Sequence, residues 1–134
     1  MEFEMAKEKA VRYLVTALRT ENEVRLKLKR INCDDNVADS VIEYLMELNY
    51  IDDDNYIDAY IRQCNSMLQY SCYEIKNKLL QKGIKKEMLN DKIAVLKDSD
   101  YESRIKNKLL NGKLKNMEEL KQKNYLYRRG FSIS

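Results

Sequence analysis

One pattern of capping and apolar residues occurs twice in this chain at a constant separation of fifty-one positions. A hydroxyl residue followed three positions later by glutamate is a capping box, which begins a helix. The apolar residues that follow recur every three or four positions, as on one face of a helix. A period near 50 residues predicts helical repeats that stack into a continuous core. The first copy contains Thr20, Glu23, Val24, Lys27, Leu28, Asn32, Cys33, Val37, Ile42 and Leu45, and the second contains Ser71, Glu74, Ile75, Lys78, Leu79, Gly83, Ile84, Met88, Ile93 and Leu96.

The chain has 134 residues, no proline and three glycines, which favours helix almost throughout. We therefore expect an all-α fold of tandem three-helix repeats, two complete and the third partial, stacked into an elongated, curved molecule. The expected division is residues 1–51 for the first repeat, 52–99 for the second and 100–134 for the partial third.

In the first repeat, the apolar spacing predicts a helix from about Phe3 to Leu18, then a second helix that ends at Asn32. Asparagine is the commonest residue after glycine in the left-handed conformation that ends a helix. Asp34 or Asp35 caps a third predicted helix. The residues expected to be buried in the first helix are Ala10, Val11, Leu14, Ala17 and Leu18, and those in the third are Val37, Val41, Leu45 and Leu48, with Ile42 and Tyr44 on its flanks.

In the second repeat, Asp52, Asp53 and Asp54 precede a strongly periodic apolar segment. Such an acidic run could bind a metal ion, but acidic side chains at a helix start are more simply explained by capping and by the helix dipole. Ser71 and Glu74 then begin the next helix, which ends at Gly83.

The third repeat is predicted from a helix that begins near Tyr101 and another that ends at Gly130, with Met117 and Leu120 on its apolar face. The segments IKNKLLQKG and IKNKLLNG look like a 30-residue repeat, but they occupy different places in their units if Gly83 corresponds to Gly130. Ser132 is a natural N-cap for a final helix, which we expect to be absent.

Cysteine usage and composition limit the classes of function. Cys33, Cys64 and Cys72 are odd in number and lie on or beside helical stripes, so we expect small core residues in a reducing cytosol. The sequence has no histidine and no Gly-rich phosphate loop, and no serine or cysteine has an evident base beside it. We therefore expect a chain that is not an enzyme and needs no cofactor or metal. No apolar run is long enough to cross a bilayer, so no membrane association is expected.

Charge is distributed unevenly along the chain. Residues 1–70 contain nine Lys and Arg against fourteen Asp and Glu, whereas residues 71–134 contain sixteen against eight. A basic half favours a polyanion or an acidic protein surface as partner, although scattered lysines can also be solvated helix faces.

The segment YIDDDNYIDAYIR contains a tyrosine–aliphatic–Asp-Asp turn and a helix with Tyr56, Tyr60 and Arg62, and YEIKNKLLQKGI contains a Leu-x-x-Lys-Gly-Ile ending. Both motifs resemble those of the RecX family of recombinase regulators. Upstream, the residues from Ala10 to Leu28 are similar to the first repeat of that family, and LYRRGFS is similar to its third repeat.

This resemblance implies a cytoplasmic, monomeric protein that lies along the RecA filament on single-stranded DNA. It implies a regulator, which we expect to be negative, of filament assembly, ATPase activity and strand exchange in recombination, DNA repair and the SOS response. The alternative is a basic helical-repeat protein that binds nucleic acid directly, with tyrosines stacked on bases. Basic residues are the candidates for partner contact, because they pair with carboxylates and phosphates: Arg12, Arg25, Arg62, Lys82, Arg104, Lys106, Arg128 and Arg129.

Overall fold

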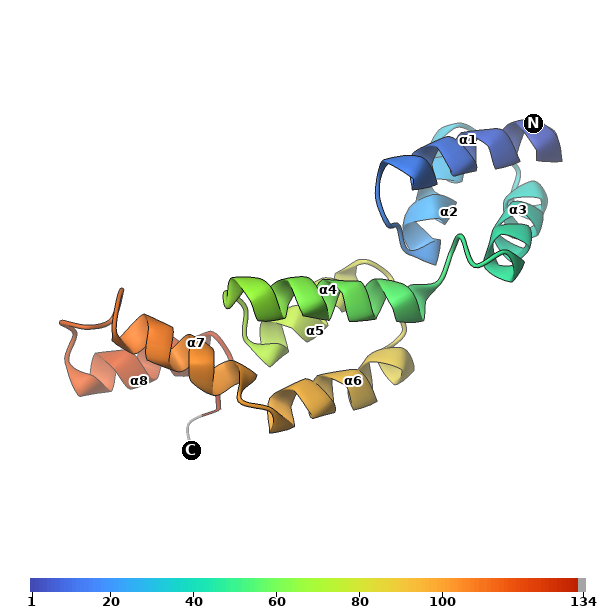
Figure 1. Cartoon of the computed structure of the whole chain (residues 1–134). Coiled ribbons are helices and arrows are strands. Elements are labelled where there is room, and N and C mark those ends of the chain that lie inside the picture. The colour runs from blue at the N-terminus through green and yellow to red at the C-terminus, as the bar shows by residue number, and fades with distance from the viewer. Residues whose placement is uncertain (133–134) are drawn as a thin grey trace. The chain divides into compact units, whose positions relative to one another are not determined.

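The computed structural model describes residues 1–132, and within that range every regular element is an α-helix. The expected all-α class is confirmed. Figure 1 shows the helices in chain order. They are α1 (Phe3–Thr16), α2 (Glu21–Arg30), α3 (Asp35–Glu47), α4 (Asp53–Met67), α5 (Cys72–Gln81), α6 (Lys86–Asp98), α7 (Tyr101–Leu110) and α8 (Glu119–Arg128).

Packing divides the chain into two compact units. Unit 1 contains Met1–Asp58, which includes α1, α2, α3 and the first turn of α4, together with the short segment Lys82–Ile84. Unit 2 contains residues 59–81 and the chain from Lys85 onward. The division into three repeats and the elongated, curved arrangement stay predictions.

Unit 1 is a three-helix cluster around one apolar core. Ala6 and Ala10 of α1 are fully buried, and such small side chains let neighbouring helices approach closely. Phe3 and Tyr44 extend the packing between α1 and α3 with an edge-to-face ring contact at 5.8 Å between centroids. The rest of this core consists of Val24, Leu28, Cys33, Ala38, Val41, Ile42, Leu45 and Ile51.

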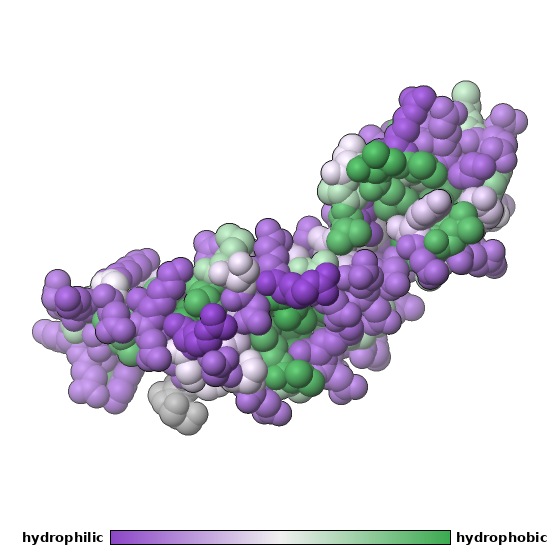
Figure 2. All heavy atoms as spheres, in the orientation of Figure 1, coloured by the Kyte–Doolittle hydropathy of each residue, from purple (hydrophilic) through white to green (hydrophobic). Residues whose placement is uncertain are grey.

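Unit 2 has its own buried set, which includes two of the three cysteines. Tyr101 at the start of α7 is fully buried, and its hydroxyl donates to the carbonyl of Tyr70 at 2.5 Å. Such a bond satisfies the one polar group of a large core residue. The aliphatic residues of this core are Ile75, Leu79, Leu89, Ile93, Leu96, Ile105 and Leu114, with Phe131 at the C-terminal end. Figure 2 shows hydrophilic atoms over most of the visible face.

The fifty-one-residue correspondence predicted from sequence is confirmed by burial. Val24 and Ile75 are both fully buried, as are Leu28 and Leu79. Each pair lies at the same place on α2 and α5. The later pairs are also both buried or both partly buried: Cys33 with Ile84, Val37 with Met88, Ile42 with Ile93, and Leu45 with Leu96.

The predicted helix ends are confirmed by the backbone. Asn32, Gly83 and Gly130 have φ values of 61°, 84° and 86°. At Gly130 the next amide, that of Phe131, donates to the carbonyl of Leu126 at 3.0 Å. The amide of Cys33 donates to the carbonyl of Leu28 at the same distance. Both are the longer bond of a Schellman motif, which satisfies the last carbonyls of a helix.

Five positions predicted on apolar helix faces are exposed. The helix α1 ends at Thr16, and Ala17 is extended, so Ala17 and Leu18 leave the apolar face and are exposed. The chain must straighten there to enter Thr20, whose extended backbone caps α2. Leu48 follows the end of α3 and is 46% exposed, while Ile42, expected on a flank, is buried instead. In the third repeat, Met117 and Leu120 are also exposed.

Candidate partner-binding site

The predicted contact residues belong to two groups with different surroundings. Lys82 and Arg129 lie where one helix end meets another, whereas the other six lie on the faces of helices. The two helix-end joints decide which of these cations are available to a partner.

The first joint, within unit 1, brings the N-terminus of α2 to the segment that follows α5. The Thr20 hydroxyl accepts from the amide of Glu23 and donates to the carbonyl of Lys82, both at 3.1 Å. The Glu23 carboxylate accepts from the Thr20 amide at 3.0 Å and lies 3.8 Å from the Lys82 ammonium. The capping box predicted at Thr20 is therefore confirmed, and it also holds a residue 62 positions away.

A glycine is required where this joint closes. A Cβ atom at Gly83 would lie 2.5 Å from the side chain of Asn22, and φ there is positive. The amide of Glu21 is also satisfied from outside its helix, since it donates to the Asp53 carboxylate at 2.9 Å. Burial raises the pKa of Asp53, with neighbouring carboxylates adding to the rise, although the bond from Glu21 opposes it.

The second joint, within unit 2, repeats this arrangement between α5 and the end of α8. The Ser71 hydroxyl accepts from the amide of Glu74 at 3.1 Å and donates to the carbonyl of Arg129 at 2.6 Å. The amide of Cys72 donates to the Glu102 carboxylate at 2.9 Å, as Glu21 does to Asp53. A Cβ atom at Gly130 would lie 2.6 Å from Tyr73. The two joints therefore have the same chemistry.

The ion pair at the second joint makes closer contacts than the Glu23–Lys82 pair at the first. The Arg129 guanidinium donates to both carboxylate oxygens of Glu74, at 2.7 and 3.2 Å, and to the carbonyl of Gln69 at 2.5 Å. Burial alone would raise the pKa of Glu74, but hydrogen bonds from Arg129 and Ser71 outweigh it and hold this pKa below its ordinary value. The bond to Glu74 likewise raises the pKa of Arg129.

This geometry corrects one expectation. Arg129 was predicted to contact a partner, but its side chain is only 22% exposed and its guanidinium is occupied by Glu74. A second role was missed: Asp53 and Glu102 cap a neighbouring helix as well as opening their own. Both acids lie in the first turn of their own helix, where acidic residues are common because of the helix dipole, so the sequence contained no separate signal for the second role.

Five of the other predicted residues are arginines that face solvent, and most of them make a polar contact with a nearby residue. Arg12 is 76% exposed and pairs with Glu8 at 2.8 Å. Arg25 pairs with Asp39 at 2.5 Å. Arg62 is exposed and has no carboxylate partner among residues 1–132. In unit 2 the guanidinium of Arg104 lies 3.5 Å from the Asn65 side chain, and that of Arg128 donates to the Asn124 carbonyl at 3.3 Å.

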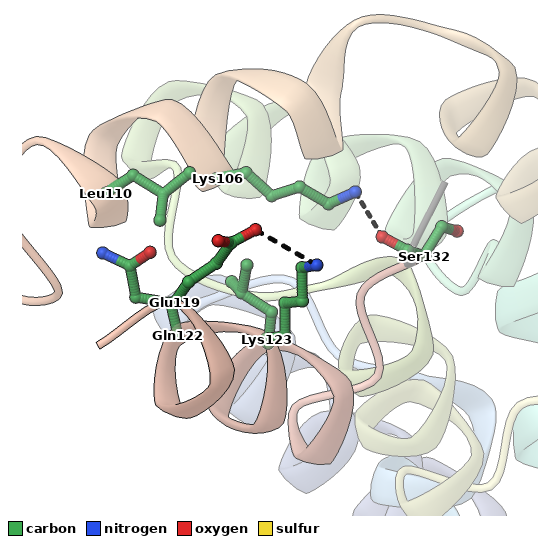
Figure 3. Close-up of a pocket in the computed structure, with 7 residues that line it drawn as sticks. Lys106, Leu110, Glu119, Gln122, Lys123 and Ser132 are labelled. Carbon is green, nitrogen blue, oxygen red and sulfur yellow. Dashed lines mark hydrogen bonds and ion pairs between the residues drawn. The ribbon is translucent and has the colours of Figure 1, made fainter. Parts of the chain in front are cut away.

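Lys106 contributes to a shallow pocket of about 260 Å³ between α7 and α8 (Figure 3). Its ammonium donates to the carbonyl of Ser132, and Glu119 pairs with Lys123 at 3.2 Å on the opposite wall. Leu110 adds an apolar surface.

The cysteine thiols lie in the core, where burial lowers their reactivity. Burial raises the pKa of Cys64 to about 11 and that of Cys72 to about 12, so both thiols stay protonated and weakly nucleophilic at neutral pH. All three cysteines are buried, as expected from the helical stripes. Within the described range, no group of three Cys, Asp or Glu residues is placed to hold a metal ion. None of the helices in this range is long and apolar enough to cross a membrane.

Comparison with known proteins gives consistent matches in sequence. A family model described as "RecX, first three-helix domain" matches residues 6–45. The regulatory protein RecX of Streptococcus agalactiae serotype III (strain NEM316) is 34% identical over 97 residues, which cover 72% of this chain and 38% of that protein. The regulatory protein RecX of Clostridium beijerinckii is 36% identical over 94 residues, 70% of this chain and 43% of that protein. The chain thus spans about two fifths of these relatives.

Two solved structures share the fold. A crystal structure of regulatory protein RecX superimposes with a TM-score of 0.83 at 24% identity, covering 98% of this chain and 68% of that one. The structure of RecX from Lactobacillus salivarius gives a TM-score of 0.80 at 26% identity, covering 97% and 88%.

Proposed function

The chain belongs to the RecX family, and from this premise we propose that it is a negative regulator of the RecA recombinase. In this proposal it binds the RecA filament on single-stranded DNA as a monomer in the cytoplasm and restrains filament assembly, ATP hydrolysis and strand exchange. The observation that carries the proposal is the similarity to proteins named regulatory protein RecX over about 70% of the chain.

The surface of each unit supports binding to a protein partner. Exposed arginines occur on α1, α4, α7 and α8 and are not gathered in one pocket. Arg62, the family-motif position, has no carboxylate partner among the described residues, so its five donors remain for a carboxylate on another protein. Contacts spread over several helices add as avidity when the partner is itself a repeating polymer.

The basic second half of the sequence gives weaker support to direct nucleic-acid binding than its charge suggests. Arg129 is committed to Glu74, Lys123 to Glu119, and Lys106 to the carbonyl of Ser132. These bonds reduce the positive charge that a phosphate backbone would meet. We therefore place the RecA filament first as the partner, with a weak direct contact to DNA as the alternative.

The test is RecA ATPase activity on single-stranded DNA with this chain titrated in. We expect ATP hydrolysis to fall at a ratio well below one chain per RecA protomer. In parallel, retention of a labelled oligonucleotide without RecA is measured at two salt concentrations. Unchanged ATPase activity together with strong, salt-sensitive retention of DNA would support the alternative and exclude the regulator.

A further inference from the structure

A pocket of about 340 Å³ in unit 1 lies between α1 and the C-terminal end of α2. Lys9, Arg12, Tyr13 and Thr16 line it from α1, at the three- and four-residue spacing that places them on one helix face. The α2 side contributes Lys27 and Ile31. None of these except Arg12 was singled out for partner contact from the sequence. The pocket is separate from both helix-end joints.

The cations around this pocket lack matching anions. Arg19 lies over the Tyr13 ring, 4.2 Å from its centroid, and its guanidinium donates to the Thr16 hydroxyl at 3.1 Å. Lys27 lies 5.6 Å from the same ring centroid. Lys9, Arg19 and Lys27 have no carboxylate within ion-pair distance among residues 1–132. Arg12 alone is paired, with Glu8, and exposed pairs of this kind contribute little.

Arg19, which packs on the lining residue Tyr13, contains a polar atom that the fold leaves unsatisfied. The Nε atom of Arg19 is buried and has no hydrogen-bond partner among the described residues. A buried N–H group that lacks a hydrogen-bond acceptor is unfavourable, because burial removes water without replacing its bond. An anion bound beside Tyr13 and Thr16 would lower this cost by Coulombic attraction.

The surroundings favour a carboxylate over a nucleic-acid phosphate. Residues 1–58 contain fourteen Asp and Glu against eight Lys and Arg, so a long polyanion is repelled by most of unit 1. Arg19 covers a face of the Tyr13 ring, which leaves less of it for base stacking. A single carboxylate needs only the local cations, and Ile31 offers an apolar surface to its aliphatic neighbours.

We propose that this pocket binds an Asp or Glu side chain, flanked by aliphatic residues, on the surface of a protein partner. The proposal deepens the proposed function and rests on it for the identity of that partner. Lys9 and Lys27 supply the attraction, Arg19 supplies a fixed positive charge behind Tyr13, and the aliphatic neighbours of the acid lie on Ile31.

The experiment uses the full chain and a short probe, the peptide acetyl-Leu-Glu-Leu-amide, with acetyl-Leu-Gln-Leu-amide as the matched neutral control. Backbone amide shifts are followed by NMR during titration. We expect saturable shifts at Tyr13, Thr16 and Lys27 with the glutamate peptide, and binding at least tenfold weaker with the glutamine peptide.

Paired variants locate the charge that is responsible. Lys9→Gln with Lys27→Gln should weaken binding of the glutamate peptide at least tenfold. Lys29→Gln with Arg30→Gln removes the same charge from exposed positions of α2 outside the pocket and should change it less than twofold. Circular dichroism of both variants establishes that they are folded. An equal loss of peptide binding in both double variants would mean that net charge alone is responsible, and would overturn the proposed binding site.

Two further outcomes would overturn the proposal. One is shifts that are absent from pocket residues or equal for the two peptides. The other is tighter binding of a twelve-residue oligothymidylate at these same amides, which would assign the pocket to nucleic acid. Normal binding of the glutamate peptide with no effect on RecA would instead mean that the proposed function is wrong. Loss of peptide binding while RecA is still inhibited would reject the pocket alone.

Discussion

Two adjacent arginines at the end of α8 differ in what they contact. The guanidinium of Arg129 makes two bonds to Glu74 and one to the carbonyl of Gln69, while Arg128 reaches only the Asn124 carbonyl within its own helix. Charge-assisted, bidentate bonds are stronger and more demanding of geometry than single neutral ones. Arg129 therefore stabilises the fold, and Arg128 remains accessible to a partner.

Arg129→Ala should lower the free energy of unfolding by about 1–3 kcal/mol, because it leaves Glu74 partly buried without its partner. Arg128→Ala should change it by less than about 0.5 kcal/mol, as expected for an exposed side chain. Denaturant unfolding of the two variants gives the comparison. Equal losses would mean that the ion pair contributes nothing beyond the removal of a long side chain.

The pKa of Glu74 predicts a pH dependence at the same joint. Its folded-state pKa lies below the ordinary 4.5, so its ionised form adds stability that is present above pH 4.5 and lost as pH falls through the lower, folded-state value. The destabilisation caused by Glu74→Gln should therefore be largest near neutral pH and shrink below pH 4.5. Urea unfolding of both proteins at a series of pH values measures it. A difference independent of pH would assign the loss to packing.

At the scale of the helix, a single hydroxyl performs two tasks. Thr20 and Ser71 each cap their own helix with the oxygen lone pair and hold a distant carbonyl with the hydroxyl hydrogen. The first task could be predicted from sequence because the capping box is local. The second could not, since nothing near Thr20 specifies that Lys82 arrives there.

The difference between local and long-range contacts also explains which other features could be predicted from the sequence and which could not. Burial of Leu28 and Leu79, and the positive φ of Gly83, follow from local periodicity and residue type. Leu18 continues the local pattern of α1 but lies outside it, because the chain has to reach the α2 cap. The cations around Tyr13 were scattered in sequence, so only the packing of α1 on α2 brings them together.

Equivalent helix positions should respond equally to truncation. Leu28→Ala and Leu79→Ala should each cost about 2–5 kcal/mol, because both side chains are fully buried at corresponding places on α2 and α5. Leu26→Ala is the control on α2: its side chain is 43% exposed, and the expected cost is below about 1 kcal/mol. A near-neutral result for either buried leucine would contradict the fifty-one-residue correspondence.

At the scale of the whole molecule, the available cations do not follow the net charge of the sequence. The acidic unit 1 contains the pocket with unpaired Lys9 and Lys27, whereas in unit 2 several basic side chains bind internal acceptors. Net charge describes long-range attraction, but a specific contact depends on which side chains lack an internal partner.

Arg62→Ala tests this distinction in the proposed regulator. The side chain is exposed and has no carboxylate partner in the described range, so the melting temperature should not change. The concentration that half-suppresses RecA ATPase should rise about five- to tenfold, with little dependence on salt, as expected for one specific bond of about 1 kcal/mol. Gln63→Ala, the exposed neighbour, is the control. Unchanged inhibition by Arg62→Ala would remove this residue from the binding surface.

The first joint also has a consequence for how the chain is made. Unit 1 is discontinuous: Thr20 finds the carbonyl of Lys82 only after 62 more residues have been added. At the usual ~5–20 residues per second, a ribosome needs roughly 3–12 s for that interval. During this interval the Thr20 hydroxyl and the Asn22 side chain face water instead of the Lys82–Gly83 turn. The first three helices of the nascent chain therefore stay incompletely closed until the ribosome has synthesised this turn.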